Sequence, residues 1–182
     1  QKAMGEAITE RDSLPVMTTL GVTTLISDSG VTRYRVNTEE WMMYDRKKPS
    51  YWAFEKGVYM EQFDSIFNVE ASIKADTAYY YDKERLWKLI GNVDIQNRKG
   101  ERFNTELLYW NEATQKVYSD KFIRIQQPDR IITGHGFDSN QQMTIYTIRN
   151  IEGIFYVDEE ASSGPPQPET KALPDSVRKD SV

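Results

Sequence analysis

Apolar and polar residues alternate with a period of two through most of this chain, and this pattern limits its fold more than any other feature. Segments such as 72–75, Ser-Ile-Lys-Ala, and 122–126, Phe-Ile-Arg-Ile-Gln, repeat it. Successive side chains of a β-strand point to opposite faces of the sheet, so the alternation predicts strands with one buried face. Helical periodicity is weak in the same region, and we also interpret residues 38–44 as strand.

Turn-forming residues separate these runs at intervals of roughly 8–15 residues, which is typical of an all-β sandwich or barrel-like fold. They occur at 27–30, 82–84, 97–100, 111–112, 128–129 and 138–140. We therefore predict an antiparallel all-β domain over residues 16–160. Residues 1–15 would form a lead-in that is helical or disordered. Residues 161–182, which begin with a Pro-rich run, would form a disordered tail.

One order of features recurs along the chain. The segments 34–45, 72–82 and 102–111 each begin with polar alternation, continue with aromatic residues and end in Asp or Asn. A shorter, Gly-rich version covers residues 131–138. The spacing corresponds to about two strands and two turns, so we predict stacked hairpins, each of which needs its neighbours to cover its apolar face.

Composition excludes several classes of function. The chain has no Cys, which rules out disulfides and thiolate zinc sites, and its one histidine, His135, provides no ligand cluster. We expect no metal, no cofactor and an exposed His135. A net charge of −5 argues against a nucleic-acid partner. No run of eighteen apolar residues is present. Gln1 suggests that an upstream signal or anchor has been removed, or that the sequence has been trimmed.

Catalytic motifs are also missing from the sequence. Neither the nucleophile elbow G-x-S-x-G nor the phosphate-binding loop G-x-x-x-x-G-K-[ST] occurs. The neighbouring carboxylates Asp82/Glu84 and those at 158–160 lie at a turn and in the expected tail and, like Glu39-Glu40, are best interpreted as solvated charge. We therefore predict that the chain binds or carries a ligand and is not an enzyme.

Several short segments together resemble the LptC family. The residues that carry the resemblance are 30–36, 72–78 (Ser-Ile-Lys-Ala-Asp-Thr-Ala), 86–95 (Leu-Trp-Lys-Leu-Ile-Gly-Asn-Val-Asp-Ile), 104–109, 118–120 and 132–137. The resemblance covers about residues 21–157, and the OstA-like proteins LptA and the LptD N-terminal domain share the same pattern. The insertion at 46–51 and the tail after residue 161 depart from it.

The resemblance implies an OstA-like β-jellyroll, an open twisted slab of two sheets. It also implies a non-enzymatic periplasmic bridge in lipopolysaccharide export, tethered to the inner membrane by an N-terminal segment. Such a bridge accepts lipopolysaccharide from an inner-membrane ABC transporter and passes it to LptA through edge-to-edge β pairing. Two alternatives remain open: a soluble LptA-like bridge without an anchor, and a carbohydrate-binding or adhesive jellyroll module.

Most of the residues expected to line an apolar trough for the lipid A acyl chains come from the phase of the alternation, and Trp52 and Phe54 are added because they follow the first repeat. They are Tyr34, Val36, Trp52, Phe54, Ile73, Ala75, Trp87, Leu89, Val93, Ile95, Phe103, Leu107, Ile123 and Ile125. The same residues would also suit an ordinary core. Gly30, Gly134 and Gly136 are candidates for close backbone approach at a sheet edge, or for simple turns and bulges. Lys47-Lys48 and Arg98-Lys99 either contact lipid phosphates or only solvate their loops.

Overall fold

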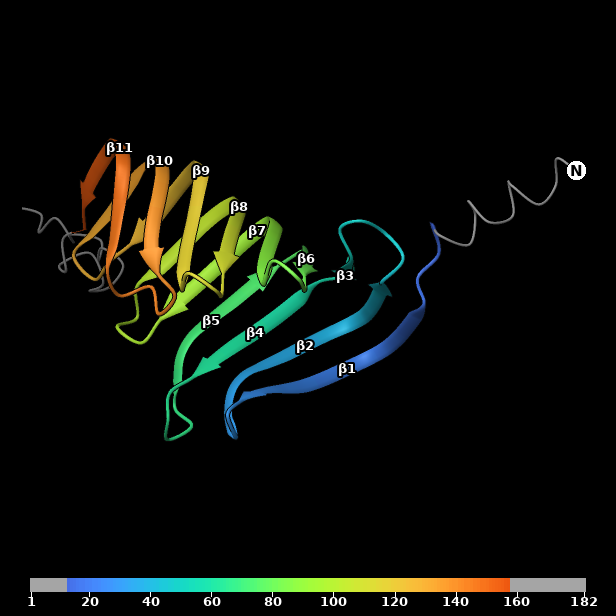
Figure 1. Ribbon diagram of the computed structural model, residues 1–182. Coiled ribbons are helices and arrows are strands. Elements are labelled where there is room, and N and C mark those ends of the chain that lie inside the picture. Colours follow the sequence, from blue (N-terminus) through green and yellow to red (C-terminus); the bar gives the residue numbers. More distant parts are fainter. Residues whose placement is uncertain (1–12, 158–182) are drawn as a thin grey trace, which may run out of the picture.

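A computed structural model describes residues 13–157, and antiparallel β-strands account for most of them (Figure 1). The strands are β1 (Met17–Asp28), β2 (Val31–Tyr44), β3 (Tyr51–Phe54), β4 (Val58–Phe63), β5 (Val69–Ala75), β6 (Thr77–Tyr81), β7 (Leu86–Asn97), β8 (Arg102–Asn111), β9 (Lys116–Gln126), β10 (Arg130–Asn140) and β11 (Tyr146–Tyr156). The all-β prediction is confirmed, and residues 38–44 are indeed strand. The predicted tail and almost all of the lead-in lie outside the described residues.

The long strands bend at a corner and belong to two sheets at once. The first half of β7 pairs with β6, with Trp87 opposite Tyr80, and its second half pairs with β5, with Asp94 opposite Lys74. β2 divides in the same way between β4 and β3. The result is a two-sheet slab in which β7 to β11 stand side by side as bent ribbons (Figure 1). This arrangement is consistent with the expected jellyroll.

Residues with a positive φ make the bend possible. In β7 the corner lies at Gly91, with a φ of +80°, and Asn92, with a φ of +45°. In β10 it lies at Gly136, with a φ of +83°. Glycine adopts this backbone region at no steric cost, and asparagine tolerates it better than most residues do. The strands therefore turn the corner without ending.

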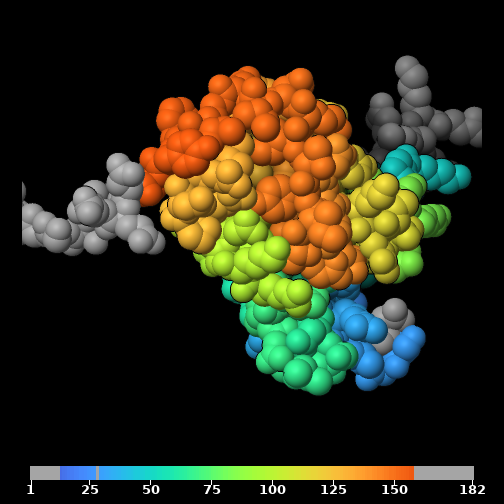
Figure 2. Space-filling view, turned by 90° about the vertical axis from the view of Figure 1, so that its left-hand side faces the viewer, coloured from blue at the N-terminus to red at the C-terminus, as the bar shows by residue number. Residues whose placement is uncertain are grey.

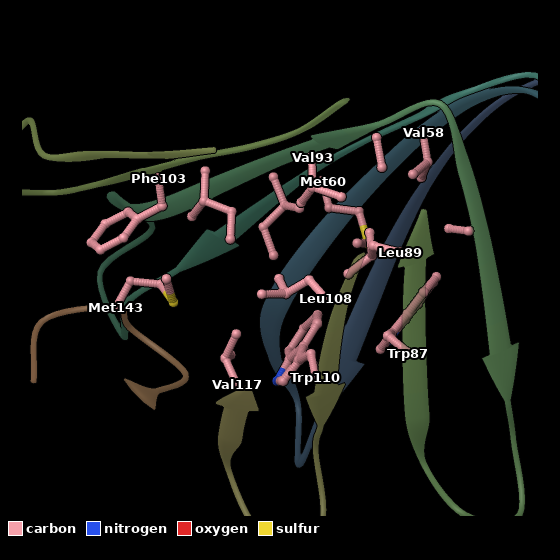
Figure 3. Close-up of a cluster of buried hydrophobic side chains, with 14 of the residues drawn as sticks. Val58, Met60, Trp87, Leu89, Val93, Phe103, Leu108, Trp110, Val117 and Met143 are labelled. Carbon is pink, nitrogen blue, oxygen red and sulfur yellow. The ribbon is translucent and has the colours of Figure 1, made fainter. Parts of the chain in front are cut away.

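The core lies between the two sheets (Figure 3). On one sheet a row of opposed residues runs across four strands, from Ile73 through Ile95 and Phe103 to Ile125. Ile95, Phe103 and Ile125 have no exposed surface. Opposed apolar pairs of this kind are the basic stabilising unit of a sheet. The row fixes the register, because a slip of one residue would turn it toward solvent.

Two predictions from the sequence are wrong. Leu107 does not join the core, where Leu108 and Trp110 lie instead. The pairing of β8 with β9 is irregular between Thr105 and Tyr109, and this irregularity changes the phase of the buried positions along β8. The predicted turn at 138–140 is part of β10, and the chain turns after Asn140.

Candidate functional site

The apolar interior contains most of the residues that the sequence singled out. Among them the buried side chains are Val36, Phe54, Ile73, Ala75, Trp87, Leu89, Val93, Ile95, Phe103, Ile123 and Ile125. Tyr34 and Trp52 are partly buried against this core. Leu108, Trp110, Phe137 and Met143 also belong to it and were missed. The change of phase in β8 precedes Leu108 and Trp110, a register shift in β10 lies next to Phe137, and Met143 lies in a turn. Burial does not test whether these side chains contact a ligand, so that contact stays a prediction.

A row of aromatic rings lines the half of the interior nearest β1. Trp41 lies 4.9 Å from Trp52, which lies 5.0 Å from Tyr80, and Tyr80 lies 4.6 Å from Trp87. Aromatic pairs at these separations add stability beyond their buried area. The indole N–H groups of Trp41 and Trp110 are buried without a hydrogen-bond partner among the described residues. Because an unpaired buried donor costs about 1–3 kcal/mol, this half is the less fully satisfied part of the core.

The interior is filled by side chains. One gap near the N-terminal end has a volume of about 10 Å³ and lies among Ile26, Trp41 and Trp52. A second gap of about 10 Å³ lies beside Tyr34 and Trp110. Spaces of this size hold no more than about one water molecule. An acyl chain therefore fits only when the two sheets move apart.

The mouth, as we call it, is a polar hollow of about 600 Å³ on the side of the slab opposite the corner. Arg33, Gln62 and Asp64 line it from one sheet. Arg85 and Glu112 line it from the strand ends of the other sheet. Glu112 accepts a hydrogen bond of 2.9 Å from the Trp87 indole and lies 3.8 Å from the Arg85 guanidinium. The mouth is thus a charged rim directly above the aromatic row.

A set of polar side chains, the clasp, joins the two sheets in the half nearest β11. It consists of Asn97, Glu101, Gln127 and Tyr146. The Glu101 carboxylate accepts hydrogen bonds from the Asn97 amide at 2.9 Å and the Tyr146 hydroxyl at 2.5 Å. Gln127 donates to the Tyr146 oxygen at 2.6 Å. Asn97 also donates to the Met143 carbonyl at 2.8 Å, which ties the β7–β8 turn to the β10–β11 turn.

Alkaline pH should weaken the fold through its buried tyrosines. Burial, followed by the Glu101 hydrogen bond, raises the pKa of Tyr146 to about 12, and burial beside Glu112 raises the pKa of Tyr80 to about 12. An unfolded tyrosine ionises near about 10, so the unfolded chain loses these protons first. Ionisation of these tyrosines should leave the free energy of unfolding unchanged below about pH 10. The free energy should then fall between about pH 10 and pH 12. Urea denaturation at pH 9 and 11.5 measures the fall.

Tyr146→Phe is the matched variant for this experiment, because it removes one of the titrating groups and keeps the ring. Its loss of stability between the two pH values should be smaller than that of the parent chain. An equal loss in both proteins would show that ionisation of Tyr146 does not contribute to the fall in stability.

Within residues 13–157, two strands, β1 and β11, have a neighbour on one side only, and they lie at opposite ends of the slab (Figure 1). Leu20 on β1 is 70% exposed, and Phe155 and Tyr156 on β11 are 59% and 72% exposed. A free edge presents unpaired N–H and C=O groups to which another strand can add. Exposed apolar side chains beside it favour such pairing.

The candidate edge glycines are only partly where the sequence placed them. Gly30 lies in the β1–β2 turn with a φ of +79°, and its contact with a partner stays a prediction. Gly134 and Gly136 lie in β10, which has β9 and β11 on either side, so the prediction that they lie at a free edge is wrong. A Cβ at Gly134 would overlap the Asn150 carbonyl oxygen, so this glycine permits close approach of β11.

No group of side chains able to hold a metal occurs between residues 13 and 157. His135 is exposed and its Nδ1 lies 2.5 Å from the Glu152 carboxylate. Over the same residues we find no helix long and apolar enough to cross a membrane.

Comparison with known proteins gives one positive result. The family model described as lipopolysaccharide-assembly, LptC-related, matches residues 15–153, which is most of the chain and nearly all of the slab. A search of curated proteins found no match. With its antiparallel slab and the match across both sheets, the chain belongs to the LptC family, which takes part in lipopolysaccharide transport.

Proposed function

We propose that the chain is a non-enzymatic periplasmic bridge in lipopolysaccharide export, anchored to the inner membrane by a preceding segment. It takes lipopolysaccharide delivered by an inner-membrane ABC transporter, shelters the lipid A acyl chains between its sheets and passes them to an LptA-like protein. The observation that supports this most directly is the asymmetry of the slab. Continuous strands close the apolar interior at the corner, whereas on the opposite side only side chains and turns close it.

The apolar interior supplies the driving force. Exposing acyl chains to water costs about 0.8 kcal/mol for each CH₂ group, so a chain crossing an aqueous compartment needs an apolar surface along its path. The inner faces of the two sheets provide such a surface once they separate. Opening is easiest about the corner, where Gly91 and Gly136 already have positive φ values and the backbone remains continuous. The separation would then occur at the mouth and the clasp.

The half nearest β1 is the more favourable point of access. Here the core contains the unpaired indole N–H groups of Trp41 and Trp110, and Trp52 is only partly buried. Arg33 and Arg85 at the mouth are placed to meet lipid phosphates while acyl chains pass inward. Acyl chains that enter here would separate side chains whose indole N–H groups lack hydrogen-bond partners, whereas the polar groups of the clasp are hydrogen-bonded to one another.

The two free edges give the bridge its direction. β1 follows the N-terminal segment that we propose to be tied to the membrane, so its edge would face the transporter. β11 lies at the other end of the slab and would pair with a strand of the LptA-like protein. Pairing of sheets edge to edge extends both inner faces into one continuous apolar surface.

Site-specific photo-crosslinking tests the trough. A photoreactive phenylalanine analogue replaces Trp87 or Phe103, both fully enclosed in the interior, and in a control it replaces Lys88 on the opposite face of β7. We expect lipopolysaccharide adducts at positions 87 and 103 and none at 88. If neither interior position captures lipopolysaccharide, or if position 88 captures it equally well, acyl chains do not pass between the sheets.

A further inference from the structure

The tip of the β4–β5 hairpin displays apolar side chains to solvent. Ile66 is 77% exposed, Phe67 53% and Val69 46%. The hairpin end projects from the slab and, with the β1–β2 turn, forms the lower lobes in Figures 1 and 2. Single exposed apolar residues are common on protein surfaces, whereas a cluster at one protruding turn marks a contact surface.

Hydrogen bonds hold the tip in this form. The Asp64 carboxylate accepts from the backbone N–H of Ile66 at 2.9 Å and of Asn68 at 2.8 Å. Phe67 has a φ of +67°, and its ring stacks on Phe63 with centroids 4.2 Å apart. A bulky residue rarely adopts a positive φ. The turn therefore holds Ile66 outward and keeps the Phe67 ring against Phe63 with about half of its surface exposed.

Three cations, together with the acidic Glu70, lie near this tip. Ala71 lies opposite Asn97, so the β7–β8 turn with Arg98 and Lys99 is next to the β4–β5 turn. Arg33 lines the mouth together with Asp64. Among the described side chains, which do not include that of Asp28, none of these three cations forms an ion pair, and the Asp64 carboxylate accepts hydrogen bonds from the turn's own N–H groups.

We propose that the β4–β5 tip inserts Ile66 and Phe67 into the surface of an anionic phospholipid bilayer. A stable protein interface buries roughly 800 Å² on each partner, more than a convex turn of this size offers. Insertion into a bilayer needs no complementary partner surface, because each apolar side chain gains from burial independently. Arg33, Arg98 and Lys99 would lie at the level of the anionic headgroups.

This contact would give the mouth a defined position. Phe63, Asp64 and Ser65 belong both to the hairpin end and to the lining of the mouth. Insertion of the tip therefore places the mouth at the headgroup level of the bilayer. The inference goes beyond the proposed bridge and does not depend on acyl chains entering the interior.

A single fluorescent label tests the proposal, because the chain has no native cysteine. In the 182-residue chain, Ile66→Cys carries an environment-sensitive NBD group, and Ile145→Cys, whose side chain is 75% exposed at the β10–β11 turn, carries the same group as a control. The probe is vesicles of phosphatidylethanolamine and phosphatidylglycerol without lipopolysaccharide. We expect a blue shift and a rise in emission at position 66 alone, and a weaker response with phosphatidylcholine vesicles.

A double variant tests the same contact without a label. Ile66→Ser with Phe67→Asn removes the apolar surface, and asparagine tolerates the positive φ at position 67. We expect the dissociation constant for anionic vesicles, measured by co-sedimentation, to rise about tenfold or more, given the two apolar side chains removed. An unchanged dissociation constant overturns the proposal. So does the absence of a label response at position 66, an equal response at position 145, or an equal response with phosphatidylcholine. Because the vesicles contain no lipopolysaccharide, failure of the trough leaves these results unaffected.

Discussion

Glu101→Ala is expected to lower the free energy of unfolding by about 3 kcal/mol, because it removes a nearly buried carboxylate that accepts two hydrogen bonds. The Asn97 amide and the Tyr146 hydroxyl would each lose a partner in a region with little access to water. For a domain of this size the loss corresponds to a fall in melting temperature of roughly 10 °C. Urea denaturation and thermal unfolding both measure it.

The same variant should also take up lipopolysaccharide more readily. In the proposed mechanism the sheets separate on the mouth side, and the clasp opposes that separation. Removing Glu101 therefore lowers the cost of opening as well as the stability of the closed form. We expect a several-fold rise in photo-crosslinking of lipopolysaccharide at position 103, whose ring lies 5.1 Å from that of Tyr146. A destabilised protein with greater ligand capture is not expected from damage to an ordinary core.

Glu106→Ala provides the control. Glu106 is an exposed glutamate at the outer side of the corner, and its one hydrogen bond is accepted from the Asn92 backbone N–H at 3.2 Å. Its removal should change stability by less than about 0.5 kcal/mol and leave capture unchanged. A Glu101→Ala protein that loses stability without gaining capture would make the clasp a purely structural feature.

Sequence reasoning identified the strands well because the period-two signal depends on burial of one face, which the fold imposes along each strand. The row from Ile73 to Ile125 follows from alternation in four separate segments. The alternation is misleading at Leu107, because an irregularity in the β8–β9 pairing changes the phase of the strand and the local composition gives no sign of it. Turn chemistry at 138–140 was equally misleading, because Asp138 and Ser139 pair with Thr147 and Tyr146 in an ordinary ladder.

The clasp and the mouth lay beyond sequence reasoning for a different reason. Asn97 and Met143 are 46 positions apart, and Glu101 and Tyr146 are 45 apart. Their contact depends on the angle at which each strand turns the corner, and this angle is set by single residues such as Gly91. The resemblance to the family indicated an apolar interior, but the contacts that keep it closed are specific to the three-dimensional arrangement.

Ile154→Pro should abolish most of the binding of a partner strand at the β11 edge while leaving the slab intact. The Val157 N–H donates to the Asp129 carbonyl at 3.0 Å, and the Gln127 N–H donates to the Arg130 carbonyl at 2.8 Å. Hydrogen-bonded and non-hydrogen-bonded pairs alternate along an antiparallel ladder. Ile154, opposite Ile132, is therefore in a non-hydrogen-bonded pair, and its N–H points away from β10 to the free edge.

Proline at this position removes a donor that only a partner can use and adds a ring that obstructs its approach. We expect a loss of about 1–3 kcal/mol in binding of an LptA-like protein, which is roughly a five- to hundredfold rise in Kd, measured by titration calorimetry. Ile154→Val keeps the N–H and should bind nearly as well as the parent chain. Phe155→Pro removes a donor to β10 and should lower stability instead. If Ile154→Pro and Ile154→Val bind equally well, the partner does not add a strand at β11. Transfer along the slab must then run in the opposite direction, or the partner must bind a different surface.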